Sequence, residues 1–226
     1  MTTPLRRYGV GARWYDVLSG ERWVYGAGRE AGIRLLDLHP GDVVIDLGCG
    51  TGLNFAGLVA AVGPTGRVIG IDRSADMLAV ARRRVSAAGW DAVVTLLAAD
   101  AATVDPREIL AATGGRGADA VFSTYALSVI PQRDEAWRRA CAAVRPGGRA
   151  GIVDMQRPRG RWRLLEPLAL LACATGGADI DAHPVHLLER DAADPREIGR
   201  AERKGGHLVA VAADLADRVT LGADSA

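Results

Sequence analysis

The chain has 226 residues, of which 28 are lysine or arginine and 27 are aspartate or glutamate, for a formal net charge of +1. This length suits one globular domain, or one domain with a small lid, and leaves little room for two independent cores. The balanced charge excludes a strongly basic nucleic-acid scaffold, because such proteins concentrate lysine and arginine to meet the phosphate backbone. We therefore expect no nucleic-acid partner.

The cysteines indicate a reducing environment. Cys49, Cys141 and Cys173 are far apart and odd in number, so neither a disulfide framework nor a metal knuckle can be drawn from them. The N-terminal residues include arginines but no apolar segment typical of a signal peptide. We therefore expect a cytoplasmic protein.

Apolar runs in the chain are short. The longest, residues 164–174, is interrupted by a glutamate and a proline, and it is about half of the roughly 20 residues that a membrane-spanning helix needs. We expect no membrane span, which leaves peripheral contact with a membrane open.

Strand-like and helix-like segments alternate from residue 42 onward. Runs rich in valine and isoleucine predict strands at 43–46, 67–72, 93–98, 119–125 and 149–155, and a last strand at 207–212. Apolar residues at helical spacing predict helices over 53–62, from a capping Ser74 to about 85, from 105 onward, and over 134–144. Such alternation is typical of a parallel sheet with helices on both faces.

The regular alternation covers only the middle of the chain. We expect residues 1–40 to form an N-terminal helical lid, residues 41–213 to form the core, and residues 214–226 to be a frayed tail. Residues 161–204 lack the alternation and are predicted to be a mostly helical insertion.

A glycine-rich loop follows the first predicted strand. Its glycines, Gly48, Gly50 and Gly52, would let the backbone turn tightly and approach a ligand at the start of a helix. The dinucleotide fingerprint places its third glycine one residue later, where this chain has Leu53. Asp46, two residues before the first glycine, would repel a pyrophosphate but suits an ammonium or sulfonium group.

Three acidic residues stand at the ends of three successive predicted strands. Asp46 ends the first strand, Asp72 the second and Asp100 the third. In an open α/β sheet these strand ends form the ligand crevice, and an acid after the second strand can accept both hydroxyls of a ribose. Asp100 can accept from an exocyclic amine such as that of adenine.

Four segments resemble the motifs of class I S-adenosylmethionine-dependent methyltransferases. Residues 43–54 (VVIDLGCGTGLN) are similar to the first motif, residues 69–77 (IGIDRSADM) to the next, residues 98–101 (AADA) to the adenine-contacting turn, and residues 144–154 (VRPGGRAGIVD) to a late motif. The resemblance implies a Rossmann-like α/β fold with a seven-stranded, mostly parallel sheet, helices on both faces and an antiparallel last strand.

The resemblance also implies a cofactor site for S-adenosylmethionine, with S-adenosylhomocysteine as product. Gly48, Gly50 and Gly52 would pass under the amino-acid part of the cofactor, and Asp46 would help to hold its ammonium group. Asp72 would bind the ribose, Met77 would pack near the adenine, and Asp100 would accept from the adenine amine. The implied set is completed by Cys49 (through its backbone only), Asn54, Arg73, Ala99, Ala101 and Thr124.

Missing motifs narrow the methyl acceptor. The fourth predicted strand ends in FSTYALS, without the signature of DNA-adenine and glutamine methyltransferases and without an aspartate that could hold Mg²⁺. A small molecule, such as a secondary metabolite, or a lipid headgroup remains as the acceptor, methylated on nitrogen or oxygen. A weaker resemblance, carried by residues 15–20 and 125–131, is to bacterial phospholipid and betaine-lipid headgroup N-methyltransferases and to secondary-metabolite methyltransferases.

Candidate catalytic residues lie outside the motifs. Tyr15 belongs to a cluster of aromatic residues that would either pack a helix onto the sheet or close over the cofactor. His183 and His186 would serve as a general base or as solvated or capping residues. Asp181 or Glu189 could add a third ligand to the two histidines, but we predict no metal site. Tyr15 would belong to the lid, and residues 161–204, which include both histidines, would build the acceptor wall.

Three other functions stay open. A methyltransferase-like fold can use the cofactor for another group transfer or a rearrangement, and it can also bind without catalysis. A nicotinamide-dependent oxidoreductase is disfavoured by Leu53 and Asp46.

Overall fold

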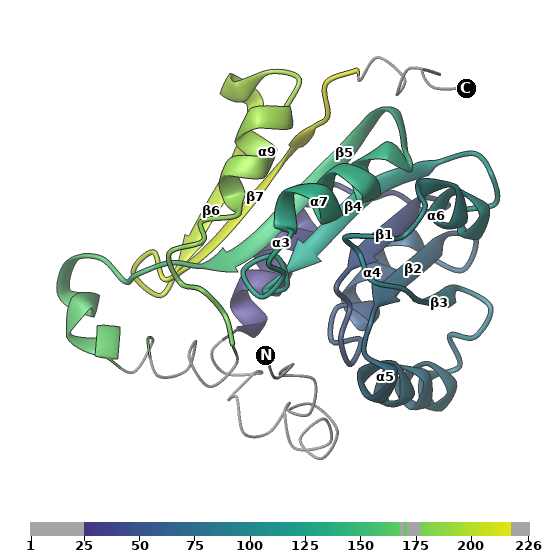
Figure 1. Ribbon diagram of the computed structural model, residues 1–226, viewed down its shortest axis with the longest axis horizontal. Coiled ribbons are helices and arrows are strands. Elements are labelled where there is room, and N and C mark those ends of the chain that lie inside the picture. Colours follow the sequence, from purple (N-terminus) through teal and green to yellow (C-terminus); the bar gives the residue numbers. More distant parts are fainter. Residues whose placement is uncertain (1–24, 168–169, 171–176, 218–226) are drawn as a thin grey trace, which may run out of the picture.

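One seven-stranded sheet organises the computed structural model, which describes residues 25–167, 170 and 177–217 (Figure 1). The strand order is β3-β2-β1-β4-β5-β7-β6. Strands β1 to β5 pair in parallel, and β7 is antiparallel to both β5 and β6, which confirms the predicted α/β sheet. The strands are β1 (Val43–Leu47), β2 (Arg67–Asp72), β3 (Val94–Ala98), β4 (Ala118–Thr124), β5 (Val144–Met155), β6 (Gly199–Arg203) and β7 (Leu208–Asp214).

Helices cover both faces of the sheet. On one face lie α3 (Gly26–Leu36), α4 (Phe55–Val62) and α5 (Ala75–Ala88), and on the other lie α6 (Pro106–Ala112), α7 (Arg133–Ala142) and α9 (Val185–Asp191) (Figure 1). The predicted cap of α5 is confirmed, because the Ser74 side chain accepts a hydrogen bond from the Met77 N–H. Two short 3-10 helices, η1 (Gly160–Leu165) and η2 (Pro195–Glu197), lie between β5 and β6 in the chain.

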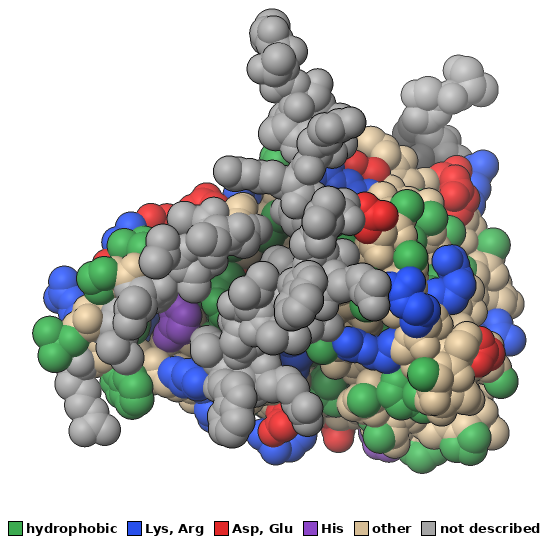
Figure 2. Space-filling view, turned by 90° about the horizontal axis from the view of Figure 1, so that it is seen from below, with side chains coloured by type: hydrophobic (Ala, Val, Ile, Leu, Met, Phe, Trp, Pro, Cys, Tyr) green, Lys and Arg blue, Asp and Glu red, His purple; other side chains and the backbone are tan. Residues whose placement is uncertain are grey.

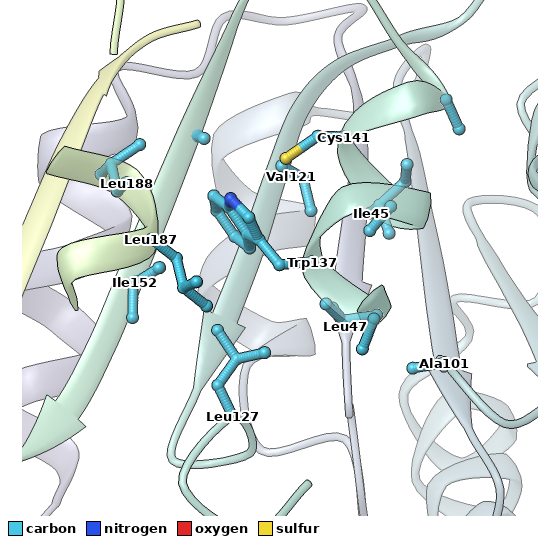
Figure 3. Packing of buried hydrophobic residues seen from close by; sticks show 14 of the residues in the cluster. Ile45, Leu47, Ala101, Val121, Leu127, Trp137, Cys141, Ile152, Leu187 and Leu188 are labelled. Atoms are coloured by element: carbon cyan, nitrogen blue, oxygen red, sulfur yellow. The ribbon is translucent and has the colours of Figure 1, made fainter. Parts of the chain in front are cut away.

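Trp137 of α7 lies at the centre of one of the two hydrophobic layers. Its ring is fully buried, and its indole N–H donates a hydrogen bond of 3.0 Å to Asp191 Oδ2 at the end of α9. Figure 3 shows the ring surrounded by aliphatic side chains of the sheet and of α9, among them Ile152, Leu187 and Leu188. This one residue therefore ties two helices to the sheet.

The strand order reverses between β1 and β4. The chain adds β2 and β3 on one side of β1, and β4 and β5 on the other. Loops that leave β1 and β4 consequently turn away from each other and leave a crevice at the carboxyl edge of the sheet, which is where ligands bind in such folds.

The chain segment after β5 differs from the sequence prediction. The stretch predicted as mostly helical, 161–204, ends in the strand β6, and the predicted last strand 207–212 runs to Asp214. Strand β6 lies at the sheet edge and exposes Arg200, Glu202 and Arg203, so it has no apolar alternation to reveal it. Leu215 of the predicted tail is buried and pairs with Ala192, whereas residues 218–226 lie outside the described part.

Helix α3, the described helix of the predicted lid, packs directly on the sheet. A side chain at Gly32 would clash with Val153 and with the Phe122 ring, so the helix approaches the strands closely. Ala31 and Leu36 are buried in the same contact. The rest of the predicted lid, residues 1–24, lies outside the described residues.

Replacing Trp137 tests how much this layer stabilises the fold. Trp137→Ala should lower the free energy of unfolding by about 3–5 kcal/mol, because a large buried side chain is lost and a cavity is left. Trp137→Phe, which loses the hydrogen bond to Asp191 and part of the buried ring, should cost less, about 1–3 kcal/mol. Urea unfolding followed by circular dichroism measures both. Leu164→Ala is the control, since this side chain is 87% exposed and should change stability by less than about 0.5 kcal/mol.

Candidate functional site

A pocket of about 200 Å³ opens at the carboxyl edge of the sheet, beside the point where the strand order reverses. Its walls come from the loops after β1, β2, β3 and β4 and from α3. The predicted cofactor residues that line it are Gly48, Cys49, Gly50, Asp72, Arg73, Met77, Ala99, Asp100, Ala101 and Thr124. Asp46, Gly52 and Asn54, also predicted, do not line it.

The glycine loop forms the floor of the pocket. The N–H groups of Gly48 and Cys49 both donate to the Ile71 carbonyl at 2.9 Å, which ties the loop to the end of β2. Gly48 has a φ of +71°, and a side chain there would clash with Ala126. A Cβ at Gly50 would meet no atom within 4 Å, so the backbone at this position faces open space. The loop is thus shaped for a ligand that rests on its backbone.

Cys49 has no reactive thiol. Its side chain is buried, and burial, together with the negative charges of Asp46 and Asp72, raises the pKa of the thiol well above its usual range. Such a cysteine stays protonated, so it can serve the loop only through its backbone.

Asp72 ends β2 with both carboxylate oxygens anchored. The Gly50 N–H donates to one oxygen at 2.9 Å and the Ser74 N–H to the other at 2.8 Å. Burial raises the pKa of this carboxyl, and the two backbone donors oppose the rise. The carboxylate is therefore held in one orientation at the pocket wall, with lone pairs left to accept from a ligand.

Asp100 follows β3 and lines the pocket. Its Oδ1 accepts from the Ala102 N–H at 2.9 Å, and its Oδ2 lies 3.5 Å from the Arg73 guanidinium. Met77, on α5, also lines the pocket. This part of the wall offers an acceptor oxygen beside an apolar surface, a combination that suits a flat ring with an exocyclic amine.

Asp46 lies fully buried behind the glycine loop. Its Oδ1 accepts from Asn54 Nδ2 at 2.7 Å, and its Oδ2 has no hydrogen-bond partner among the described residues. Burial raises the pKa of this carboxyl to about 7, against the opposing effects of Asn54 and of the positive charge of Arg29. A buried acceptor without a partner is costly, so this atom is suited to a cationic ligand group.

Arg29 of α3 is a site residue that sequence reasoning missed. Its Nη1 donates to Asn54 Oδ1 at 3.0 Å and to Thr124 Oγ1 at 2.7 Å, and its guanidinium lies 5.0 Å from the centre of the Tyr125 ring. No motif surrounds it, but it follows the buried stripe of α3, four residues after Tyr25 and three before Gly32. A charged residue on a buried stripe is the signal that could have found it.

Tyr125, also missed, lines the pocket just after β4. Its φ of +55° is unusual for a bulky residue. Its hydroxyl donates to the Tyr25 carbonyl at 2.9 Å, and the two rings lie 5.0 Å apart. These contacts hold the ring between α3 and the strand end.

The predicted catalytic residues do not meet at this pocket. His183 lines a second hollow with Arg159 and Arg163, and His186 is exposed and contacts Glu189 at 2.6 Å. Tyr15 lies outside the described residues. Within the described ranges no group of three histidine, cysteine or acidic side chains could hold a metal ion, and no helix is long and apolar enough to cross a membrane.

Comparison with known proteins identifies the domain. Residues 44–148 match the family described as "Methyltransferase domain". Similar relatives include a demethylmenaquinone methyltransferase of Bacillus cytotoxicus (30% identical, 63% of this chain, 56% of the relative) and a trans-aconitate 2-methyltransferase of Variovorax paradoxus (34% identical, 65% of this chain, 49% of the relative). The chain spans about half the length of most of the curated relatives it matches.

A solved structure has the same fold. The structure of a SAM-dependent methyltransferase from Aquifex aeolicus superposes with a TM-score of 0.59 at 18% identity, over 90% of this chain and 96% of the other. The family match and this fold agree with the strand order and with the glycine loop. Residues 44–148 are therefore similar to a methyltransferase domain, and the chain has the fold of the S-adenosylmethionine-dependent methyltransferase from Aquifex aeolicus.

Proposed function

We propose that this chain is an S-adenosylmethionine-dependent methyltransferase that acts on a small molecule or a lipid headgroup, at nitrogen or oxygen. The observation that carries the proposal is the pocket at the carboxyl edge of the sheet, with Asp72 held at its wall and the unpartnered Asp46 oxygen buried behind its floor. Relatives named for a quinone and for a carboxylic acid as acceptor support a small acceptor.

The pocket residues fit the parts of the cofactor. Asp72 would accept from the ribose hydroxyls, Asp100 from the adenine amine, and Asp46 would favour the ammonium group of the amino-acid part. The open space at Gly50 would admit the chain of the cofactor against the loop backbone. When bound, the cofactor supplies an electrophilic methyl group.

Catalysis of such a transfer is mainly alignment of two reactants. Arg29 and Tyr125 would order the wall on the acceptor side, since they join α3 to the start of α4 and to the end of β4. A base is needed only where the acceptor loses a proton, and Tyr15, His183 and His186 remain our candidates for that role. The predicted lid 1–40 and the acceptor wall 161–204 remain proposals as well.

Ligand preference tests the cofactor assignment. S-adenosylhomocysteine should bind with a dissociation constant on the order of micromolar, and NAD should not bind, because Asp46 repels a pyrophosphate and Leu53 replaces the third glycine of the dinucleotide loop. Isothermal titration calorimetry measures both ligands. Binding of NAD alone would refute the proposed methyltransferase and favour an oxidoreductase.

Removing the Asp72 carboxylate tests the ribose contact. Asp72→Ala should weaken S-adenosylhomocysteine binding by roughly 10- to 150-fold, since hydrogen bonds to a charged group contribute about 1.5–3 kcal/mol. Asp76→Ala is the matched control, because Asp76 is exposed on the neighbouring helix and does not line the pocket. Unchanged affinity in a folded Asp72→Ala variant would remove Asp72 from the proposed ribose site.

The raised pKa of Asp46 predicts a pH dependence of cofactor binding. The ammonium group of the bound ligand favours the charged form of Asp46, so ligand binding should lower the pKa of Asp46 from about 7. Below pH 7, where the free carboxyl is mostly protonated, binding should therefore release a proton. Affinity for S-adenosylhomocysteine should therefore rise roughly tenfold from pH 6 to pH 8 and level off above the pKa that Asp46 has in the ligand-free protein. Calorimetry at several pH values measures it.

Two variants isolate Asp46 as the titrating group. Asp46→Asn should abolish the dependence between pH 6 and pH 8. Asp154→Asn should leave it intact, because Asp154 is also buried, with a pKa raised to about 6 by that burial, but belongs to β5 and does not adjoin the glycine loop. If Asp46→Asn kept the full slope, another group would be responsible and Asp46 would not contact the ammonium.

A further inference from the structure

The helix η1 and the turn between β6 and β7 form one surface at the margin of the molecule. The Arg159 N–H donates to the Gly205 carbonyl at 2.9 Å, and a side chain at Gly205 would clash with the Trp162 ring, so η1 packs on this turn. Figure 1 shows η1 beyond the carboxyl end of β5, away from the body of the sheet. We call the exposed residues of this region the docking surface: Arg159, Trp162, Arg163, Leu164, Arg203 and Lys204.

The docking surface exposes large apolar side chains. Among the described residues, Trp162 and Leu164 are the large hydrophobics that remain exposed, at 38% and 87%. Leu164 therefore buries almost nothing in this chain. A leucine held in water beside a tryptophan is typical of a place that another apolar phase covers.

Basic side chains surround these two residues. Arg159, Arg163, Arg203 and Lys204 are all exposed, and Figure 2 shows hydrophobic and basic side chains side by side at this end of the molecule. The acid Glu202 lies 3.9 Å from Arg159 but also pairs with Arg200. Glu166 is bound by Arg157. The docking surface thus has an excess of positive charge around an apolar centre.

We propose that the docking surface binds the anionic face of a lipid bilayer. Tryptophan and leucine would enter the interface, while the arginines would extend their guanidinium groups to lipid phosphates. A nucleic acid would meet the same positive charge but has no apolar phase to cover Leu164. Because no described helix could span a membrane, the contact would be peripheral.

This placement has a consequence for the pocket. Strand β5 runs parallel to β4, so η1 leaves the same carboxyl edge of the sheet at which the pocket opens. A bilayer bound at the docking surface would therefore lie on the side from which an acceptor enters. The inference goes beyond the proposed methyl transfer and does not depend on it.

Vesicle binding by the full chain tests the proposal. Vesicles of phosphatidylglycerol and phosphatidylcholine should co-sediment with the protein, and vesicles of phosphatidylcholine alone should bind it much less. Leu164→Ser and Arg163→Glu should each reduce binding to the anionic vesicles by about 5- to 30-fold, and added salt should weaken the wild-type interaction.

Matched controls separate the surface from general effects. Arg107→Glu makes the same charge change on an exposed residue of α6 and should leave vesicle binding near the wild-type value, and Leu164→Ile should keep the apolar contact. The proposal would be overturned if the wild-type protein did not bind anionic vesicles, or if Leu164→Ser and Arg163→Glu bound them as well as the wild type. The proposal would also be overturned if the wild-type protein bound a short RNA but no vesicles, and if Leu164→Ser and Arg163→Glu lost the RNA binding.

The readout is independent of the cofactor. A failed vesicle assay leaves the binding of S-adenosylhomocysteine untouched, and a failed calorimetric titration leaves the vesicle result standing. The two proposals can therefore fail separately.

Discussion

A carboxylate buried behind the glycine loop is the constraint around which the site is built. Asp46 is held at the end of β1 with one oxygen bound by Asn54 and the other unpartnered among the described residues. Burying such a charge is costly, so the surrounding groups must either compensate it or let it take up a proton. The raised pKa is the consequence, and a cationic ligand group would relieve the cost. A ligand that carries such a group would therefore complete the site.

Helix α3 links that constraint to the packing of the domain. Its glycines let it approach the sheet closely, and only at that distance can Arg29 reach both Asn54 and Thr124. The same helix positions the Tyr25 carbonyl for the Tyr125 hydroxyl. Loss of helix packing would therefore disturb the site even where no pocket residue is changed, because the charge near Asp46 and the ring of Tyr125 both depend on α3.

Sequence reasoning predicted the strands β1 to β5 and the cofactor loop, because buried parallel strands are continuous apolar runs and the loop has a fixed chemical partner. It missed β6, an edge strand in which the exposed Arg200 and Glu202 leave no alternation of apolar and polar residues. It also ended the last strand at residue 212, two residues before the end of β7. It also missed Arg29 and Tyr125. Their roles arise from long-range contacts, across 95 residues from Arg29 to Thr124, which no local pattern encodes.

The same distinction separates the two halves of the pocket. Residues that would contact the cofactor lie at strand ends. There, an acidic residue at a fixed position can accept hydrogen bonds from a ribose or an amine, so a sequence motif predicts these residues. The residues that we propose for the acceptor side, Arg29 and Tyr125, come from α3 and from the turn after β4, and their positions depend on how helix and sheet pack. His183 and His186 stay predictions as general bases: His183 lines another hollow and His186 is exposed. Spacing along the chain indicates chemistry only where the backbone between the residues is itself fixed by the motif.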